Sequence, residues 1–125
     1  RLCALPALWV GLLYDTTALD AAWDLCRDWS EEERANMRAE VPRTALKTPF
    51  RNGTVRDLAE RTIEIAREGL RNRAVRDSFG EDECHFLSAL DLIAESGECP
   101  AEEKLKAFHG KWNGNIDELY AEYAY

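Results

Sequence analysis

The sequence predicts a mostly α-helical protein segment. Apolar residues recur at helical spacing, signals for helix starts are frequent, and no alternating run of β-branched residues typical of strands is present. The length of 125 residues suits one domain and is short for two, and a hydrophobic content of 46% is ordinary for a globular protein. We therefore expect a single helical unit over residues 1–125.

The first expected helix covers residues 2–14 and is apolar on every side. The stretch LCALPALWVGLL (2–13) has no charged residue, and Pro6 suits a first helical turn. A helix that is apolar all round is usually buried, so we expect a sheltered helix here. The stretch is too short to span a bilayer, and no signal-peptide cleavage pattern precedes Asp15. Because the chain also begins without Met, we expect it to be part of a longer polypeptide.

Three pairs of residues match the capping box, in which a hydroxyl and an acidic side chain three residues apart satisfy backbone N–H groups at a helix start. The pairs and the helices they open are Thr17 with Asp20 for 18–29, Ser30 with Glu33 for 31–40, and Thr54 with Asp57 for 55–74. The third helix has the clearest apolar stripe: Val55, Leu58, Ala59, Thr62, Ile65, Ala66, Gly69 and Leu70. We expect this stripe to face the core.

Three further helices are expected in the second half of the chain. One covers residues 82–96 and ends at Gly97, and the next starts at Pro100 and stops at Gly110. Asn115 and Glu118 are expected to cap a last short helix.

The charge balance excludes broad classes of partner. The net charge is −8 and the pI is near 4.8. Binding to nucleic acids or anionic membranes requires an extended basic surface, so we expect neither partner.

The cysteines and histidines give no metal site. Cys3, Cys26, Cys84 and Cys99 show no CxxC or paired Cys/His spacing. We interpret them as free, mostly buried thiols in a cytoplasmic protein, although a secreted protein with disulfides is an alternative. His85 follows three acidic residues and a cysteine, but consecutive helical residues point in different directions and do not converge on a metal.

The best candidate for chemistry is KTPFRNG (47–53). Between Glu40 and Asp57 there is no carboxylate, whereas four cations fall there: Arg43, Lys47, Arg51 and Arg56. Pro49 and Asn52-Gly53 favour a defined loop that could hold Lys47 and Arg51 as a fork, and the following helix points its positive N-terminal end towards the same region. Lys47 and Arg51 are therefore candidates for binding a phosphate or a carboxylate. The alternative is an exposed connecting loop whose cations offset the negative body.

No catalytic residue is identified from the motifs. The chain has no nucleophile–base pair, phosphate-binding glycine loop or dinucleotide fingerprint. Its four tryptophans, Trp9, Trp23, Trp29 and Trp112, fit core or interface anchors better than base-stacking residues, because no basic groove accompanies them.

Three stretches resemble the C-terminal portion of glutamate–cysteine ligase, of the type found in plants and many proteobacteria. They are LPALWVGLLYD (5–15), VPRTALKTPFRNG (41–53) and PAEEKLKAFHGKWNGNIDELYAEYAY (100–125), and the likeness runs across the whole chain. Ala45 stands where the family has Gly, and Asn113 and Asn115 stand where it usually has Gly and Ser. The resemblance implies that residues 1–125 are the C-terminal helical part of a larger catalytic domain, which is α+β with an antiparallel catalytic sheet.

The resemblance also implies an activity. Such a ligase uses ATP and Mg²⁺ to phosphorylate the γ-carboxylate of glutamate, and the amine of cysteine then attacks the acyl phosphate to give γ-glutamylcysteine, the first step of glutathione synthesis. The implied partners are glutamate, cysteine, ATP and the remainder of the ligase chain. The implied location is the cytoplasm, or the plastid for a plant or algal protein.

The family's substrate-site segment, its metal-binding acids and the regulatory disulfides of the plant enzymes lie upstream of the matching region. No catalytic residue, metal ligand or disulfide therefore transfers to these positions. We expect the chain to be inactive alone and to fold poorly. The alternative is a stand-alone helical module that is derived from such a ligase and regulates a partner.

Overall fold

The structure, a computed structural model, describes residues 2–124 and is mostly helical, as the sequence predicts. The α-helices of this part are α1 (Ala4–Leu13), α2 (Thr16–Cys26), α3 (Glu31–Thr44), α4 (Val55–Arg73), α5 (Ser88–Ser96), α6 (Pro100–His109) and α7 (Asp117–Tyr123). The described part also contains two 3₁₀ turns, η1 (Ala45–Lys47) and η2 (Glu83–Leu87). It further contains a short antiparallel hairpin of β1 (Pro49–Phe50) and β2 (Gly53–Thr54).

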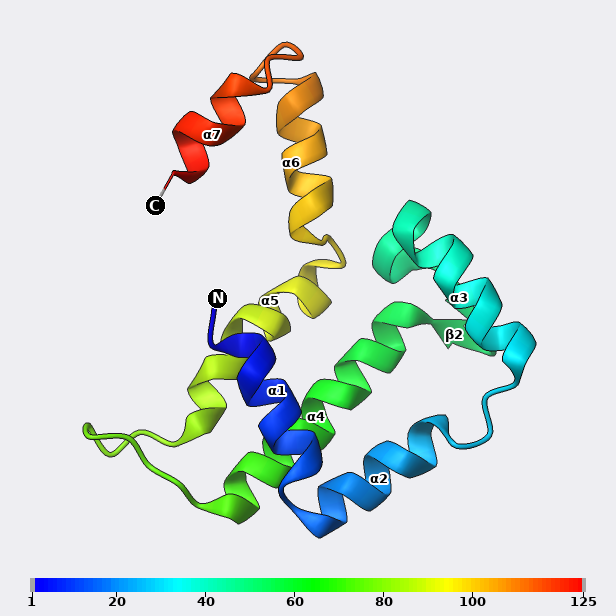
Figure 1. The fold of residues 1–125 in the computed structure, drawn as a ribbon, viewed down its shortest axis with the longest axis vertical. Coiled ribbons are helices and arrows are strands. Elements are labelled where there is room, and N and C mark those ends of the chain that lie inside the picture. Colours follow the sequence, from blue (N-terminus) through cyan, green and yellow to red (C-terminus); the bar gives the residue numbers. More distant parts are fainter. Residues whose placement is uncertain (1, 125) are drawn as a thin grey trace.

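The helix α4 is the centre of the arrangement. In Figure 1, α1 crosses α4, and α2 and α5 lie beside it. The helices α6 and α7 extend away from this group, and α3 lies near the start of α4 next to the hairpin. The predicted stripe of α4 supplies the core residues Ile65, Ala66 and Leu70.

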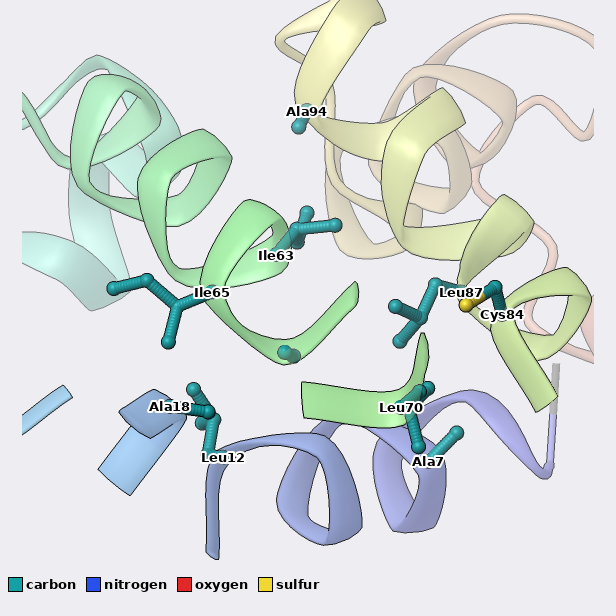
Figure 2. Close-up of a cluster of buried hydrophobic side chains, with 10 residues drawn as sticks. Ala7, Leu12, Ala18, Ile63, Ile65, Leu70, Cys84, Leu87 and Ala94 are labelled. Atoms are coloured by element: carbon teal, nitrogen blue, oxygen red, sulfur yellow. The ribbon is translucent and has the colours of Figure 1, made fainter. Parts of the chain in front are cut away.

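The core lies where α1 meets α4. Figure 2 shows Ala7 and Leu12 pointing from α1 towards the side of α4 that carries Leu70 and Ile65. Leu87 and Cys84 of η2 close the cluster next to Leu70. Each of these side chains is less than a tenth exposed, so the hydrophobic effect holds these elements together.

Two glycines allow α1 and α4 to touch through their backbones. A Cβ atom built on Gly11 would lie 2.2 Å from the carbonyl oxygen of Ala66, and one built on Gly69 would lie 1.9 Å from the carbonyl oxygen of Gly11. No side chain fits at such distances, so the crossing of the two helices depends on glycine at both positions.

The burial expected for residues 2–14 is only partly correct. The helix forms, with Pro6 in its first turn, and Ala4 and Ala7 on its inner side are buried. Its outer side, however, is open to solvent, with Leu5 57% and Trp9 54% exposed. The described part of the chain covers one face of this apolar helix.

Two of the three predicted capping boxes are present. Ser30 and Glu33 exchange hydrogen bonds at the start of α3, and Asp57 accepts from the backbone N–H of Thr54 at the start of α4. The box predicted at Thr17 is wrong, because α2 begins at Thr16 and is capped by Asp15, whose carboxylate accepts from the N–H of Ala18 at 2.9 Å.

Other helix boundaries also differ from the prediction. The helix predicted for 31–40 continues through Pro42 to Thr44, and the one predicted for 82–96 divides into η2 and α5. The last helix starts at Asp117, whose N–H donates to the side chain of Asn115.

The surface of the molecule is large for its mass. It exposes 8846 Å², whereas a compact monomer of 14.2 kDa exposes about 6,800 Å². The separation of α6 and α7 from the central group and the open face of α1 account for this shape (Figure 1).

Candidate anion-binding segment

The cationic segment, residues 43–56, runs from the end of α3 through η1 and the hairpin into α4. Thr48, which is 2% exposed, fixes its centre. The Thr48 hydroxyl donates to the carbonyl oxygen of Ala45 at 2.7 Å, and the carbonyl oxygen of Thr48 accepts from the N–H of Val55 at 2.9 Å. The predicted defined loop is therefore present, and its two ends are joined by hydrogen bonds.

Two residues of the segment adopt positive φ. Ala45 has φ 48° and ψ −128°, and Arg51 has φ 51°. The sequence indicated positive φ at Asn52-Gly53, so the turn of the hairpin lies one residue earlier than expected. Ala45 carries backbone strain, because an L residue with a Cβ rarely adopts this region.

Arg51 joins the hairpin to the start of α3. Its Nε donates to Glu33 Oε1 at 2.7 Å and its Nη2 to Glu33 Oε2 at 3.1 Å, while Nη1 contacts the Asp28 carboxylate at 3.3 Å. The guanidinium also lies 5.4 Å from the ring centroid of Phe50, which packs edge-on against Trp29. We call this group, Arg51 with Asp28 and Glu33, the Arg51 clamp.

The clamp shifts the pKa of Glu33 and of Arg51. The hydrogen bond from Arg51, followed by the one from the backbone of Ser30, lowers the pKa of Glu33 to about 2. The same pairing raises the pKa of Arg51. Glu33 is therefore a carboxylate at any physiological pH.

Lys47 contacts a different part of the chain. Its Nζ lies 2.9 Å from Oε1 of Glu102 in the first turn of α6. The backbone N–H of Cys99 and then Lys47 lower the pKa of Glu102 to about 2, and Glu102 raises the pKa of Lys47. Lys47 and Arg51 thus point to separate carboxylates and do not form one fork in this structure.

A cleft of about 570 Å³ opens beside Lys47, between the start of α4 and the end of α5. Arg56 also lines it; its Nε lies 2.9 Å from Glu60, and its Nη2 donates to the carbonyl oxygen of Glu95 at 2.8 Å. The remaining lining residues are Leu46, Thr54, Asp57, Glu60, Ser96, Gly97 and Glu98. No local sequence pattern indicates that the end of α5 approaches Lys47, because that proximity depends on the tertiary fold.

The start of α4 already carries its own anion. Asp57 Oδ2 accepts from the backbone N–H of Thr54 at 2.7 Å and from its hydroxyl at 2.8 Å, and these hydrogen bonds lower the pKa of Asp57. An incoming anion at this helix end therefore competes with Asp57.

The described residues do not fit a magnesium site. In residues 2–124, no three His, Cys, Asp or Glu side chains lie close enough together to hold a metal ion. His85, considered above, has its Nδ1 2.6 Å from the carbonyl oxygen of Asp82.

The four cysteines are free, as predicted, but their burial varies. Cys84 is buried, Cys26 and Cys99 are half-buried, and Cys3 is exposed. Burial raises the pKa of the Cys84 thiol.

The tryptophans also differ in their burial. Trp112 is 5% exposed, and its Nε1 donates to Glu122 of α7 at 3.1 Å, whereas Trp9 and Trp23 are more than half exposed.

None of the helices within residues 2–124 combines the length and the apolar character that a membrane crossing needs.

Comparisons with known proteins give the family. The family model for glutamate–cysteine ligase family 2 (GCS2) matches residues 1–122. Glutamate–cysteine ligase A, chloroplastic, of Oryza sativa subsp. indica is 46% identical over 125 residues, which are all of this chain and 24% of that protein. The chloroplastic glutamate–cysteine ligases of Arabidopsis thaliana and Brassica juncea are 44% and 42% identical over the whole chain, which covers 23% of each. The chain spans about a quarter of the length of these relatives, and it belongs to glutamate–cysteine ligase family 2.

Proposed function

We propose that residues 1–125 form the C-terminal helical part of an ATP-dependent glutamate–cysteine ligase. The intact enzyme would join the γ-carboxylate of glutamate to the amine of cysteine through γ-glutamyl phosphate, the first step of glutathione biosynthesis. The observation that carries this proposal is the family match over residues 1–122. The names of the relatives give the chloroplast as their location, which adds the plastid to the cytoplasm as a location for this protein.

The segment would support the chemistry rather than perform it. The side chains of residues 2–124 do not form a site for Mg²⁺, so the metal ligands and the catalytic residues would lie in the rest of the enzyme. ATP would supply the phosphoryl group that activates glutamate, and most of its binding residues would lie in the part of the ligase outside this chain. The helices around α4 would buttress that part.

The test is a chimaera of the rice ligase in which the matching quarter is replaced by this chain. We expect the chimaera to form γ-glutamylcysteine in a reaction that requires ATP, glutamate and cysteine, because the replaced quarter is 46% identical. The rice ligase with the same quarter deleted is the control and should be inactive. A folded chimaera without this activity would contradict the proposal, and so would ligase activity of the 125-residue chain by itself.

Within that enzyme, we propose that Lys47 and Arg51 contribute to the binding of an anion, either a nucleotide phosphate or a substrate carboxylate. The side chain of Lys47 is 65% exposed and borders the cleft together with Arg56, which supports this role more directly for Lys47 than for Arg51. Binding would exchange the Glu102 partner of Lys47 for the ligand, and the positive end of α4 would add to the attraction.

Lys47→Met and Arg51→Met in the chimaera test this role. Loss of a charged hydrogen bond to the ligand should raise KM for ATP or glutamate about tenfold. Arg61→Met is the matched control, because Arg61 is an exposed cation of α4 that pairs with Glu64. An unchanged KM in variants of normal thermal stability would contradict this role and favour the alternative, in which the segment is only a connecting loop.

A further inference from the structure

The helix α1 has two apolar faces, and the described chain covers only one of them. The inner face, Ala4, Ala7, Gly11 and Leu12, is buried against α4 and its neighbours. The opposite side, which we call the outer α1 face, consists of Leu2, Leu5, Trp9 and Leu13, with exposed fractions of 80%, 57%, 54% and 49%. Leu5, Trp9 and Leu13 are four residues apart and align along the helix, and Leu2 lies in the turn just before it.

The outer α1 face lacks the features of a surface made for water. No charged residue occurs from Leu2 to Tyr14, so no ionic group interrupts the apolar stripe. Contiguous exposed apolar patches on soluble proteins usually mark a contact with another surface. The central Trp9 is large and amphipathic, and tryptophan is the residue type most often found as an energetic anchor of an interface.

The charge of the chain indicates what kind of surface covers this face. Helices that lie on membranes carry Lys and Arg beside their apolar side, but α1 has neither, and the whole chain has a net charge of −8. An apolar protein surface is therefore the better partner.

The size of the molecule and its relatives identify that protein surface. The exposed surface exceeds that of a compact monomer of this mass by about 2,000 Å², more than the roughly 800 Å² that one partner buries in a standard interface. The relatives are about four times as long as this chain, so a ligase of this family contains a large additional part that could cover the face.

We propose that the outer α1 face is the surface on which this segment docks to the remaining three quarters of the ligase, with Trp9 as the central anchor. The inference rests on the proposed function and adds to it the residues of the contact. In the intact enzyme, α1 lies between α4 on one side and the ligase remainder on the other. The uniformly apolar sequence of α1 follows from these two contacts.

Thiol protection tests the contact without placing a charge in it. Leu5→Cys and the matched control Leu92→Cys, which lies on α5 and is 67% exposed, are each introduced into the 125-residue chain and into the rice chimaera. Labelling by a maleimide is followed at each site by tandem mass spectrometry, because fragment ions separate position 5 from Cys3 and Cys26 on the same tryptic peptide. We expect the rate at position 5 to fall about tenfold or more in the chimaera, and the rate at position 92 to stay within about twofold, because a covered thiol reacts slowly.

The outcomes separate the contact from the activity. An active chimaera that labels as fast at position 5 as the chain alone would overturn the docking surface and leave the proposed function standing. A folded but inactive chimaera with position 5 protected would support the docking surface and contradict the function. If position 5 becomes protected in the chain alone as its concentration rises, the face contacts a second copy of the chain. If the chimaera has no cooperative thermal transition, the face does not fit the ligase. Both of these results overturn the proposal.

Discussion

At the scale of single residues, the strained backbone at Ala45 has the clearest consequence. Ala45 and Asn113 both adopt positive φ, 48° and 47°, and both stand where the family resemblance leads us to expect glycine. Asn tolerates the left-handed region better than Ala, because its short polar side chain can form local hydrogen bonds. The free-energy cost of a positive φ is therefore larger at Ala45, which lies near Lys47 in the cationic segment.

Replacing Ala45 with glycine should stabilise the protein. Ala45→Gly relieves a backbone conformation that costs about 1–3 kcal/mol, and we expect a gain in the free energy of unfolding of about 1 kcal/mol after the entropy cost of glycine. Urea denaturation measures the change. Ala35→Gly, in an exposed position of α3, is the control and should lose about 1 kcal/mol. If Ala45→Gly loses stability as the control does, the backbone at Ala45 is not strained.

The Arg51 clamp predicts a pH dependence. The pKa of Glu33 falls from 4.5 to about 2 on folding, so the clamp contributes its full stability above pH 4.5 and loses it as the pH falls to about 2. Glu33→Gln should therefore be less stable than the unmodified chain at pH 6, and the difference should vanish near pH 2. Thermal denaturation across this range measures it, with Glu32→Gln on the same turn as the control for loss of charge. A constant difference at every pH would exclude the clamp as its cause.

Single residues also show how far the sequence could be interpreted. The Ser30–Glu33 box was predictable because both partners are three residues apart, whereas the box at Thr17 failed because the nearby Asp15 is a competing cap. The Lys47–Glu102 pair joins residues 55 apart, and no local pattern indicates such a contact. Lys47 and Arg51 were recognised as a charged group, but their partners depend on the tertiary fold.

At the scale of the elements, the contact between α1 and α4 sets the core. The apolar stripe of α4 and the apolar character of α1 were evident from periodicity, and the helices form as predicted. Periodicity does not reveal which helices meet, and it gave no indication that Gly11 and Gly69 touch. The burial of α1 was overestimated, because its apolar sequence does not reveal that the described chain covers only one of its faces; the proposed docking of the outer α1 face would account for the rest.

Gly69→Ala should separate the two helices. Alanine favours helix formation by about 1 kcal/mol over glycine, but its Cβ would lie 1.9 Å from the carbonyl oxygen of Gly11. We expect a net loss of about 1–3 kcal/mol in the free energy of unfolding, as for other overpacked cores. Urea denaturation measures the loss, and Glu68→Ala, at an exposed neighbouring position, should change stability by less than about 0.5 kcal/mol. A neutral Gly69→Ala would show that the helices are not in close contact.

At the scale of the whole molecule, the helices differ in how firmly they are held. The helix α4 buries five residues, whereas α3, α6 and α7 bury none. The arm of α6 and α7 has a small centre of its own, where Trp112 lies edge-on to Tyr123 with ring centroids 6.3 Å apart.

Hydrogen exchange should separate these regions in the 125-residue chain. Backbone amides of α4 should exchange slowest, because they open only with the core, and those of α6 and α7 should exchange faster by about a hundredfold or more. Exchange measured by mass spectrometry checks this, and the chimaera serves as the reference in which the ligase remainder is present. Equal protection of all helices in the chain alone would indicate one cooperative unit and would contradict the expectation of poor folding.

Because α4 is long, a small change at the glycine contact near one end displaces the other end of the helix. Gly69 lies near one end of this helix, and Thr54, beside the cationic segment, lies at the other end, about 22 Å away at the rise of an α-helix. A tilt of about 5° at the glycines would displace Thr54 by about 2 Å at that helix length, enough to lengthen or break a hydrogen bond. The positions of Lys47 and Arg56 thus depend on the contact of Gly69, near the far end of α4, with Gly11 of α1.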